Sequence, residues 1–355
     1  MRVAVVLKTF PPDVVGGMET QTKRMAAELH ESGHNVTVFT KRFGEHVDSD
    51  VPYEVVRVRN WRFNPVISDL TFLVFAIAGL LRRRDEFDLL QCMMIYPVGF
   101  LGYVVGRLVG LPYFAWVRGG DYYLMNNVWW KRWMMRRVLS DTLVLVQSKE
   151  IRGDIVSDFE DVDCDVEVVG NAVSVPSERA SGKDVLYVGR LAPKKGVGYL
   201  VRAVEGIDVP LVVVGDGPER DRLESLADER AVDAAFVGEV PPDEVGEYYR
   251  SSAVFVLPST SGEGMPNVVL EAMAWGLPVV ATDSGGTPSV IDDRTNGYLV
   301  PTRDEAALKD RIERLLGDEV KRMEMGEAAR RYVRNQHSWE RLVDELGAVY
   351  ERVVG

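Results

Sequence analysis

The chain is 355 residues long, with 46% hydrophobic and 27% charged residues, which is typical of a folded protein and excludes disorder and low complexity. At roughly 100 to 200 residues per domain, this length predicts two domains, each large enough to bury its own core. Fifty-four acidic and 42 basic residues give a net charge of -12, which excludes a broad positive face and general binding to nucleic acid.

Short valine-rich runs alternate with longer amphipathic stretches in the first half of the chain. This alternation predicts parallel strands joined by crossover helices. We expect a first helix near residues 19–32, ending at Gly33, because glycine readily takes the left-handed conformation that closes a helix. The expected strands cover residues 3–7, 35–40, 53–58, 89–93, 113–117, 142–147 and 166–169.

Residues 171–184, NAVSVPSERASGKD, are small, polar and without periodicity, and so predict a linker. The strand pattern then restarts, and the chain from Asp304 onward is expected to be helical. The further strands are expected at 185–189, 211–215, 234–238, 254–258 and 278–282. We therefore predict an α/β protein with two doubly wound, Rossmann-like domains facing each other across a cleft. The predicted parts are an N-terminal domain over 1–170, a C-terminal domain over 185–335 and a terminal helix over 336–355.

The cellular location is predicted from three features of the sequence. The chain enters its first strand directly, without an apolar signal segment, and the apolar stretch Val66–Leu81 contains Asp69 and is shorter than the ~20 residues that span a bilayer. Cys92 and Cys164 form neither a zinc spacing nor a disulfide framework, which indicates a reducing compartment. We expect a cytoplasmic protein, with contact at the inner face of the membrane left open.

Unusual residues gather just after the predicted strands. Ligands of doubly wound sheets bind beyond the carboxyl ends of the strands, so this clustering is expected of a binding site. The residues concerned are Gly16 and Gly17, residues 118–121, 190–195 and 215–218, Gly238 and Glu239, and residues 259–263. If the two carboxyl edges face each other, all of them line one cleft.

The segment 258–288 contains the most specific pattern. Gly264 follows a strand, and Pro266 suits the start of a helix, where no amide hydrogen is needed. The free amides of this helix start, at Met265, Asn267 and Val268, predict a phosphate site, with Pro266, which has no amide hydrogen, shaping the turn. Glu271, one turn further on, can accept hydrogen bonds from ribose hydroxyls, and Glu263 on the loop can reach a sugar hydroxyl. The alternative is a capped core helix with two solvated carboxylates.

A second segment, VGRLAPKKG, places Arg190 and Lys195 in the loop after a strand. A diphosphate leaving group gains charge as a glycosidic bond breaks, and two fixed cations stabilise that charge without a metal. Lys194 is the weaker candidate. The alternative for this segment is a solvated basic turn.

These segments together make the chain similar to the retaining glycosyltransferases of family 4, which have the GT-B fold. The resemblance covers nearly the whole chain, and the two glutamates stand seven residues apart, as in the family pattern. Its motifs are Gly16-Gly17-Met18-Glu19, Arg118-Gly119-Gly120-Asp121, Gly170-Asn171, Gly189-Arg190-Leu191 with Lys195-Gly196, Gly215-Asp216-Gly217-Pro218, and Glu263 with Glu271.

The resemblance implies transfer of a sugar from a nucleotide diphosphate donor to a glycan or a lipid-linked acceptor, with retention at the anomeric carbon. It implies that Arg190 and Lys195 hold the diphosphate, that Glu271 holds the ribose and that Glu263 contacts the donor sugar. The backbone at Gly16 and Gly17 approaches the donor and the acceptor, and Gly238 and the residues from Gly264 to Asn267 complete the donor site. The resemblance implies neither a metal nor a cofactor other than the donor. The leaving phosphate itself takes the acceptor proton. The resemblance also implies that the terminal helix over 336–355 crosses back to the N-terminal domain.

The sequence departs from the family pattern at two positions. Many relatives have histidine where Arg118 stands, and none of the four histidines falls in a motif loop, so proton transfer by histidine is not supported. Arg118 either binds a phosphate or an anionic acceptor, with Asp121 on the same acceptor-side turn, or forms a structural ion pair with Asp121. Many relatives also have glutamate where Ser289 stands, which puts one minor donor contact in doubt.

Two further segments have competing interpretations. Residues 160–167, EDVDCDVE, carry the Asp-x-Asp spacing of metal-dependent enzymes, but acids before a strand are more typical of a solvated turn. Residues 126–138 interleave tryptophans with lysine and arginines, and predict either a helix at an anionic membrane surface or a helix packed on the sheet. Rival functions for the whole chain are a nucleotide-sugar 2-epimerase of the same fold and a non-catalytic scaffold that binds sugar nucleotides.

Overall fold

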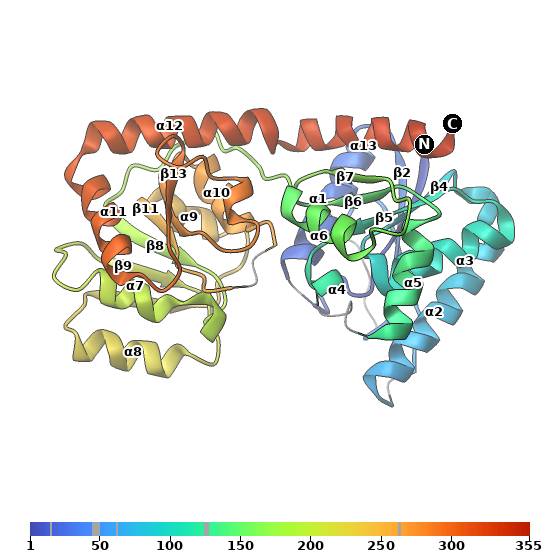
Figure 1. The fold of residues 1–355 in the computed structure, drawn as a ribbon, viewed down its shortest axis with the longest axis horizontal. Coiled ribbons are helices and arrows are strands. Elements are labelled where there is room, and N and C mark those ends of the chain that lie inside the picture. The colour runs from blue at the N-terminus through green and yellow to red at the C-terminus, as the bar shows by residue number, and fades with distance from the viewer. Residues whose placement is uncertain (15, 45–49, 62, 124–127, 262–263) are drawn as a thin grey trace. The chain divides into compact units, whose positions relative to one another are not determined.

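The computed structural model of the protein describes residues 1–14, 16–44, 50–61, 63–123, 128–261 and 264–355. Two compact units make up the chain, one of Met1–Asn171 with Trp339–Gly355 and the other of Ala172–Ser338. The break between them falls at Asn171, where the small, polar segment 171–184 begins. In each unit one parallel sheet is covered by helices on both faces (Figure 1).

The first unit is built on a seven-stranded sheet in which all pairs are parallel, with the order β3-β2-β1-β4-β5-β6-β7. Its strands are β1 (Arg2–Val6), β2 (Asn35–Lys41), β3 (Glu54–Val58), β4 (Leu89–Cys92), β5 (Tyr113–Val117), β6 (Val144–Val146) and β7 (Val166–Val168). Residues Val3 to Val6 of β1 are fully buried because the strand lies in the middle of the sheet with both faces covered. The strand order reverses between β1 and β4, which is where such sheets bind ligands.

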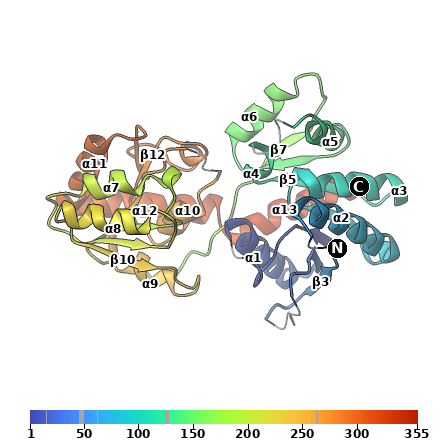
Figure 2. The same ribbon diagram turned by 90° about the horizontal axis from the view of Figure 1, so that it is seen from below.

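Helices cover both faces of this first sheet (Figures 1 and 2). Helices α2, α3 and α5 pack side by side on one face, and α1 packs with α13 on the other. The helices of the unit are α1 (Gly17–Glu31), α2 (Pro65–Arg82), α3 (Phe100–Val109), α4 (Gly120–Tyr123), α5 (Trp129–Leu139), α6 (Lys149–Asp158) and α13 (Trp339–Val354). The last helix belongs to the first unit because its Tyr350 is fully buried and donates a hydrogen bond to the side chain of Gln91 on β4, at 2.6 Å.

The second unit has a six-stranded parallel sheet with the order β10-β9-β8-β11-β12-β13. Its strands are β8 (Asp184–Val188), β9 (Leu211–Val214), β10 (Ala234–Gly238), β11 (Ser252–Leu257), β12 (Val279–Thr282) and β13 (Gly297–Val300). Its helices are α7 (Val197–Ala203), α8 (Arg220–Glu229), α9 (Val245–Arg250), α10 (Asn267–Ala274), α11 (Glu305–Gly317) and α12 (Glu319–Gln336). Helices α7, α8 and α11 lie on one face and α10 and α12 on the other (Figure 1). The order reverses between β8 and β11, which predicts a ligand site at their carboxyl ends.

The predicted fold class is confirmed, and every predicted strand lies within two residues of an observed one. Gly33 has a φ of +93°, as predicted for the residue that closes the first helix. The sequence did not predict β13. The chain beyond Asp304 is helical but breaks twice, once near Asp318 and again at His337 and Ser338. In the described part of the chain, no helix is both long enough and apolar enough to cross a bilayer.

Candidate functional site

The loop after β8 carries Arg190 and Lys195 and is pressed against the end of β11. It contains a short 3-10 turn, Pro193–Lys195, which ends at Gly196 in the left-handed region, with a φ of +66°. A Cβ at Gly196 would lie 2.1 Å from the carbonyl oxygen of Pro258, so only glycine allows this approach. The amide of Thr260 donates to the carbonyl of Lys194 at 2.8 Å. Lys195 is therefore held beside the carboxyl end of β11.

The glycine turn after β9 supports the same loop from the other side. A Cβ at Gly215 would lie 2.1 Å from the carbonyl oxygen of Gly189, and one at Gly217 would lie 2.3 Å from that of Leu191. The amide of Gly215 donates to the carbonyl of Gly238 at 2.7 Å, which brings the end of β10 into contact with this turn. The loops after β8, β9 and β10 thus pack backbone against backbone at the carboxyl edge. This close packing explains why these loops are rich in glycine.

The Arg190 side chain is exposed at this edge. Its carbonyl oxygen accepts a hydrogen bond from the Tyr187 hydroxyl at 3.1 Å, which fixes the backbone of the loop. Among the described residues, no carboxylate pairs with the Arg190 guanidinium, whereas many other arginines of this unit do have such a partner. An exposed guanidinium that is not paired with a carboxylate is suited to binding a phosphate.

Helix α10 begins at Asn267 and Pro266 is its N-cap residue, so the helix starts within the predicted range 265–268. A Cβ at Gly286 would lie 2.1 Å from the carbonyl oxygen of Gly264, so the loop that leads into the helix packs against the turn after β12. The buried Met265 completes this contact. The amides at this helix start are a site where an anion is stabilised. Glu263, which was predicted to contact the sugar, lies outside the described residues.

Glu271 is half-buried in α10, and its Oε2 accepts a hydrogen bond from the Tyr249 hydroxyl at 2.9 Å. Tyr249 lies on α9 and is almost fully buried. Burial raises the pKa of the Glu271 carboxyl, and the hydrogen bond from Tyr249 opposes that change. The tyrosine therefore holds one carboxylate oxygen and stabilises its charge. Tyr249 was not predicted from the sequence, because its 22-residue separation from Glu271 follows no motif spacing.

In the first unit, the glycine pair lies at the start of α1. Gly16 is the N-cap residue with extended backbone, and Gly17 is the first residue of the helix. A Cβ at Gly16 would lie 2.6 Å from Oε2 of Glu19, whose other oxygen accepts a hydrogen bond from Thr9 at 2.6 Å. The Glu19 carboxylate is buried against the backbone at this point. A side chain at Gly16 would therefore displace the Glu19 carboxylate from this position.

Arg118 and Asp121 lie at the carboxyl end of β5, and they do not form the ion pair that was one of the two predicted alternatives. Both Asp121 oxygens accept backbone amides, from Arg118 and from Ile95, each at 2.8 Å. The Arg118 guanidinium donates to the side chain of Asn171 at 2.7 Å and stacks over the Trp116 ring at 3.9 Å. Asp121 therefore stabilises the backbone of the turn. Hydrogen bonds from two nearby backbone amides stabilise a buried carboxylate more than one distant cation does.

Burial also shifts the pKa values of both side chains. It lowers the pKa of Arg118 to about 9 and raises the pKa of Asp121 to about 6. The Nε atom of Arg118 is buried and has no hydrogen-bond partner among the described residues. Because burial destabilises the positive charge of Arg118, an anionic ligand beside it would stabilise that charge.

The acids of residues 160–167 are engaged by arginines. Asp165 and Glu167 both pair with Arg352, and Asp161 pairs with Arg136. In the part of the chain that the structure describes, no three His, Cys, Asp or Glu side chains are grouped so that they can hold a metal ion.

Helix α5, which covers most of the basic and aromatic segment predicted at 126–138, has both packed and exposed side chains. Trp130 contacts Tyr96 edge to face at 5.7 Å, and the Arg132 guanidinium lies over Phe159 at 4.3 Å. Trp129, in contrast, is 81% exposed. Residues 126 and 127 lie outside the described residues.

Comparison with known proteins covers the whole chain. The family model described as Glycosyl transferases group 1 matches residues 174–332, and that described as Glycosyltransferase Family 4 matches residues 15–175. The phosphatidyl-myo-inositol mannosyltransferase of Mycobacterium leprae is 32% identical over 99% of this chain and 97% of its own length. The GDP-mannose-dependent alpha-mannosyltransferase of Mycobacterium tuberculosis is 30% identical over 100% of this chain and 97% of its own.

Solved structures share the fold. Sucrose-phosphate synthase from Thermosynechococcus elongatus has a TM-score of 0.82 at 21% identity, over 99% of this chain and 98% of that one. Anabaena HepE in complex with UDP has a TM-score of 0.83 at 16% identity, over 99% of this chain and 100% of that one. The chain therefore belongs to glycosyltransferase family 4, as the matched family models and the full-length relatives show, and its two parallel sheets agree with the fold of the solved structures. Members of this family are retaining, nucleotide-sugar-dependent enzymes with the GT-B fold.

Proposed function

We propose that the second unit binds the donor through the carboxyl ends of β8 to β11. Arg190 and Lys195 bind the diphosphate together with the start of α10, Glu271 binds the ribose, and Glu263 contacts the sugar. Gly238 and the residues from Gly264 to Asn267 shape this site. The observation that carries the proposal is the exposed Arg190 guanidinium, which lacks a described carboxylate partner and lies on a loop built by close glycine contacts.

The reaction on this proposal is transfer with retention and without a metal. The glycosidic bond to the diphosphate breaks, and negative charge develops on the leaving phosphate, where Arg190 and Lys195 stabilise it. The acceptor hydroxyl forms the new bond on the same face of the sugar and gives its proton to the leaving phosphate. No side-chain base is needed in this scheme. The backbone at Gly16 and Gly17 approaches donor and acceptor.

The acceptor is a glycan or a lipid-linked molecule, and Arg118 binds an anionic group on it. Arg118 is supported by its buried guanidinium, whose Nε lacks a partner among the described residues. Asp121 contributes by fixing the backbone of the same turn. A relative whose name specifies a phosphatidylinositol acceptor supports the lipid-linked class.

Helix α5 is proposed to contact the inner face of the membrane through its exposed residues. Trp129 is largely exposed, and Trp133 and Arg137 are exposed beside it. Co-sedimentation with anionic liposomes tests this contact by comparing wild type with Trp129→Ser plus Arg137→Gln. Val320→Ser is the control, because Val320 is an exposed apolar residue of α12 in the other unit. The contact predicts loss of binding in the double variant alone, and equal binding by all three proteins contradicts it.

The experiment that tests the function combines ligand binding with turnover. A thermal-shift screen of nucleotide sugars identifies the donor, because a ligand that binds only the folded state raises the melting temperature. Acceptor-dependent release of the nucleotide in excess EDTA then tests metal-independent transfer. Loss of activity in EDTA contradicts the proposed diphosphate clamp. Conversion of the donor without acceptor identifies an epimerase, and binding without turnover identifies a scaffold.

A further inference from the structure

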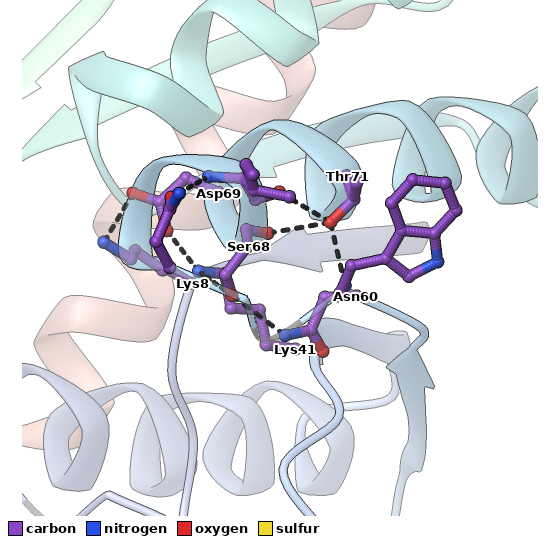
Figure 3. Close-up of polar contacts among 9 residues, drawn as sticks. Lys8, Lys41, Asn60, Ser68, Asp69 and Thr71 are labelled. Carbon is purple, nitrogen blue, oxygen red and sulfur yellow. Dashed lines mark hydrogen bonds and ion pairs between the residues drawn. The ribbon is translucent and has the colours of Figure 1, made fainter.

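A cluster of charged side chains lies at the carboxyl edge of the first sheet, apart from the residues discussed above (Figure 3). Lys8 follows β1, Lys41 ends β2, and both ammonium groups pair with the carboxylate of Asp69 in α2. The Lys8 Nζ to Asp69 Oδ2 distance is 2.8 Å. Lys41 also donates to Ser68 at 3.3 Å, and the amide of Asn60 donates to the same hydroxyl at 2.9 Å. One carboxylate thus holds two lysines in a fixed arrangement.

The two lysines differ in their access to solvent. The Lys41 side chain is 3% exposed, whereas that of Lys8 is 32% exposed and that of Asp69 is 26% exposed. Lys41 is therefore an internal anchor that holds Asp69, and Asp69 in turn positions the accessible ammonium of Lys8. An ammonium group has three hydrogen-bond donors, and Asp69 is the only partner of the Lys8 ammonium among the described residues. The remaining donors of Lys8 are available to a ligand.

The charge of the cluster favours an anion. Within the described residues, Asp69 is the only carboxylate that pairs with either lysine, so the three side chains carry a net charge of +1. The nearest acids along the loop are engaged elsewhere, since Asp13 pairs with Arg57 at 2.5 Å and Glu19 accepts from Thr9. A phosphate supplies the negative charge that this cluster lacks.

The cluster adjoins an exposed apolar stripe on α2. Val66, Leu70 and Val74 follow one another at four-residue intervals, so they lie on one face of the helix, and each is more than half exposed. Asp69 lies next to Leu70 in the same helix turn. Trp61 and Phe75 extend the apolar surface and contact each other edge to face at 6.4 Å. A positive group therefore stands at the edge of a surface that suits a hydrocarbon chain.

We propose that Lys8, positioned by Asp69 and Lys41, binds the phosphate of a lipid-linked acceptor whose apolar chain lies along Val66, Leu70 and Val74. The inference rests on the proposed function and adds a second anion-binding residue, Lys8, and a surface for the apolar chain of a lipid-linked acceptor. The phosphate is bound at the carboxyl edge beside β1, where the chain leads on to Gly16. Lys8 is a binding residue in this scheme, and Asp69 and Lys41 are positioning residues.

Binding to phosphatidylcholine vesicles that contain phosphatidic acid tests the phosphate contact. We expect Lys8→Gln to weaken binding by about tenfold, the effect of losing one hydrogen bond to a charged group, and Lys8→Arg to retain most of it. Lys149→Gln is the matched control, because Lys149 is an exposed lysine of the same unit and its loss changes the net charge equally. Equal affinities for Lys8→Gln and Lys149→Gln overturn the proposal, since net charge then explains all binding.

Two further arms test the lipid assignment. Leu70→Ser is expected to weaken vesicle binding by about tenfold, while the exposed control Val320→Ser leaves it unchanged. Glycerol 3-phosphate, which has the same phosphate without a chain, is expected not to displace the vesicles. Displacement by glycerol 3-phosphate, together with unchanged binding of Leu70→Ser, overturns the lipid assignment in favour of a soluble phosphate.

The donor half of the protein gives a separate readout. The melting temperature of Lys8→Gln with and without the nucleotide sugar found in the donor screen reports both folding and the donor site, which lies in the other unit. The inference is supported if the nucleotide sugar raises the melting temperature of Lys8→Gln as much as that of wild type while Lys8→Gln binds vesicles weakly. If neither wild type nor variant responds to any nucleotide sugar, the proposed function fails, whatever the vesicles show. If both respond and Lys8→Gln binds vesicles as wild type does, the inference alone fails.

Discussion

Replacement of Gly196 by alanine tests whether the position of Lys195 controls the rate of transfer. An added Cβ would lie 2.1 Å from the Pro258 carbonyl oxygen, and real Cβ atoms essentially never come closer than 3.0 Å. The loop must therefore move by about 0.9 Å, the difference between these two distances. The left-handed conformation costs a residue with a side chain a further ~1 kcal/mol. A displacement of about 1 Å near the reacting groups lowers rates by ~100-fold.

The matched control is Gly198→Ala, two residues further on in α7. Its Cβ would meet only the ends of flexible side chains, with Arg222 nearest at 3.4 Å, and alanine is more stable than glycine in a helix by ~1 kcal/mol. We expect Gly196→Ala to lose about 100-fold in kcat and to melt at a lower temperature, and Gly198→Ala to keep its kcat. Steady-state transfer kinetics and thermal melts measure both quantities. A folded Gly196→Ala protein with wild-type kcat would refute this reasoning.

Three other changes have defined outcomes. Lys195→Ala should slow transfer by ~100-fold as one electrostatic stabiliser is lost, and unchanged turnover of the folded variant contradicts its role. Tyr249→Phe removes the hydrogen bond that opposes the raised pKa of Glu271, so calorimetry should show that the nucleotide sugar found in the donor screen binds severalfold more weakly than to wild type, with an affinity that rises more steeply with pH; parallel pH profiles contradict this. Asp121 has a pKa of about 6 when folded and near 3.8 when unfolded, so the folded state binds more protons between these values. Wild-type stability should therefore fall by about 1 kcal/mol as the pH rises from 5 to 7, and urea unfolding of Asp121→Asn should lack this change.

The strands were predictable because each buried parallel strand is a short run of apolar, mostly β-branched residues. The run at 185–189 corresponds to β8 (Asp184–Val188), and the clustering of unusual residues after such runs follows from the parallel topology. Strand β13, with the sequence GYLV, was missed because it has no valine-rich run. It is a strand because its backbone pairs with β12, and this pairing leaves no local signal in the sequence.

The side-chain partners of the site were less predictable than its loops. Lys8, Lys41 and Asp69 meet because the ends of β1 and β2 and the N-terminal part of α2 lie at one edge, although Lys8 and Asp69 are 61 residues apart. Tyr249 reaches Glu271 only because α9 and α10 follow strands of the same sheet. The sequence could not decide whether Arg118 pairs with Asp121, because the answer depends on the buried backbone around Asp121. There, two backbone amides donate hydrogen bonds to the Asp121 carboxylate. The prediction that both carboxyl edges share one cleft stays a prediction.

The buried hydrogen bond from Tyr350 to Gln91 has a consequence for biosynthesis. The Gln91 side chain lies within the sheet, where its amide nitrogen faces the sulfur atoms of Met25 and Met93 and its oxygen depends on a residue near the end of the chain. While the ribosome still holds the last helix, this oxygen has no tyrosine to donate to it. The first unit is thus completed only after the whole of the second unit, residues 172–338, has been translated.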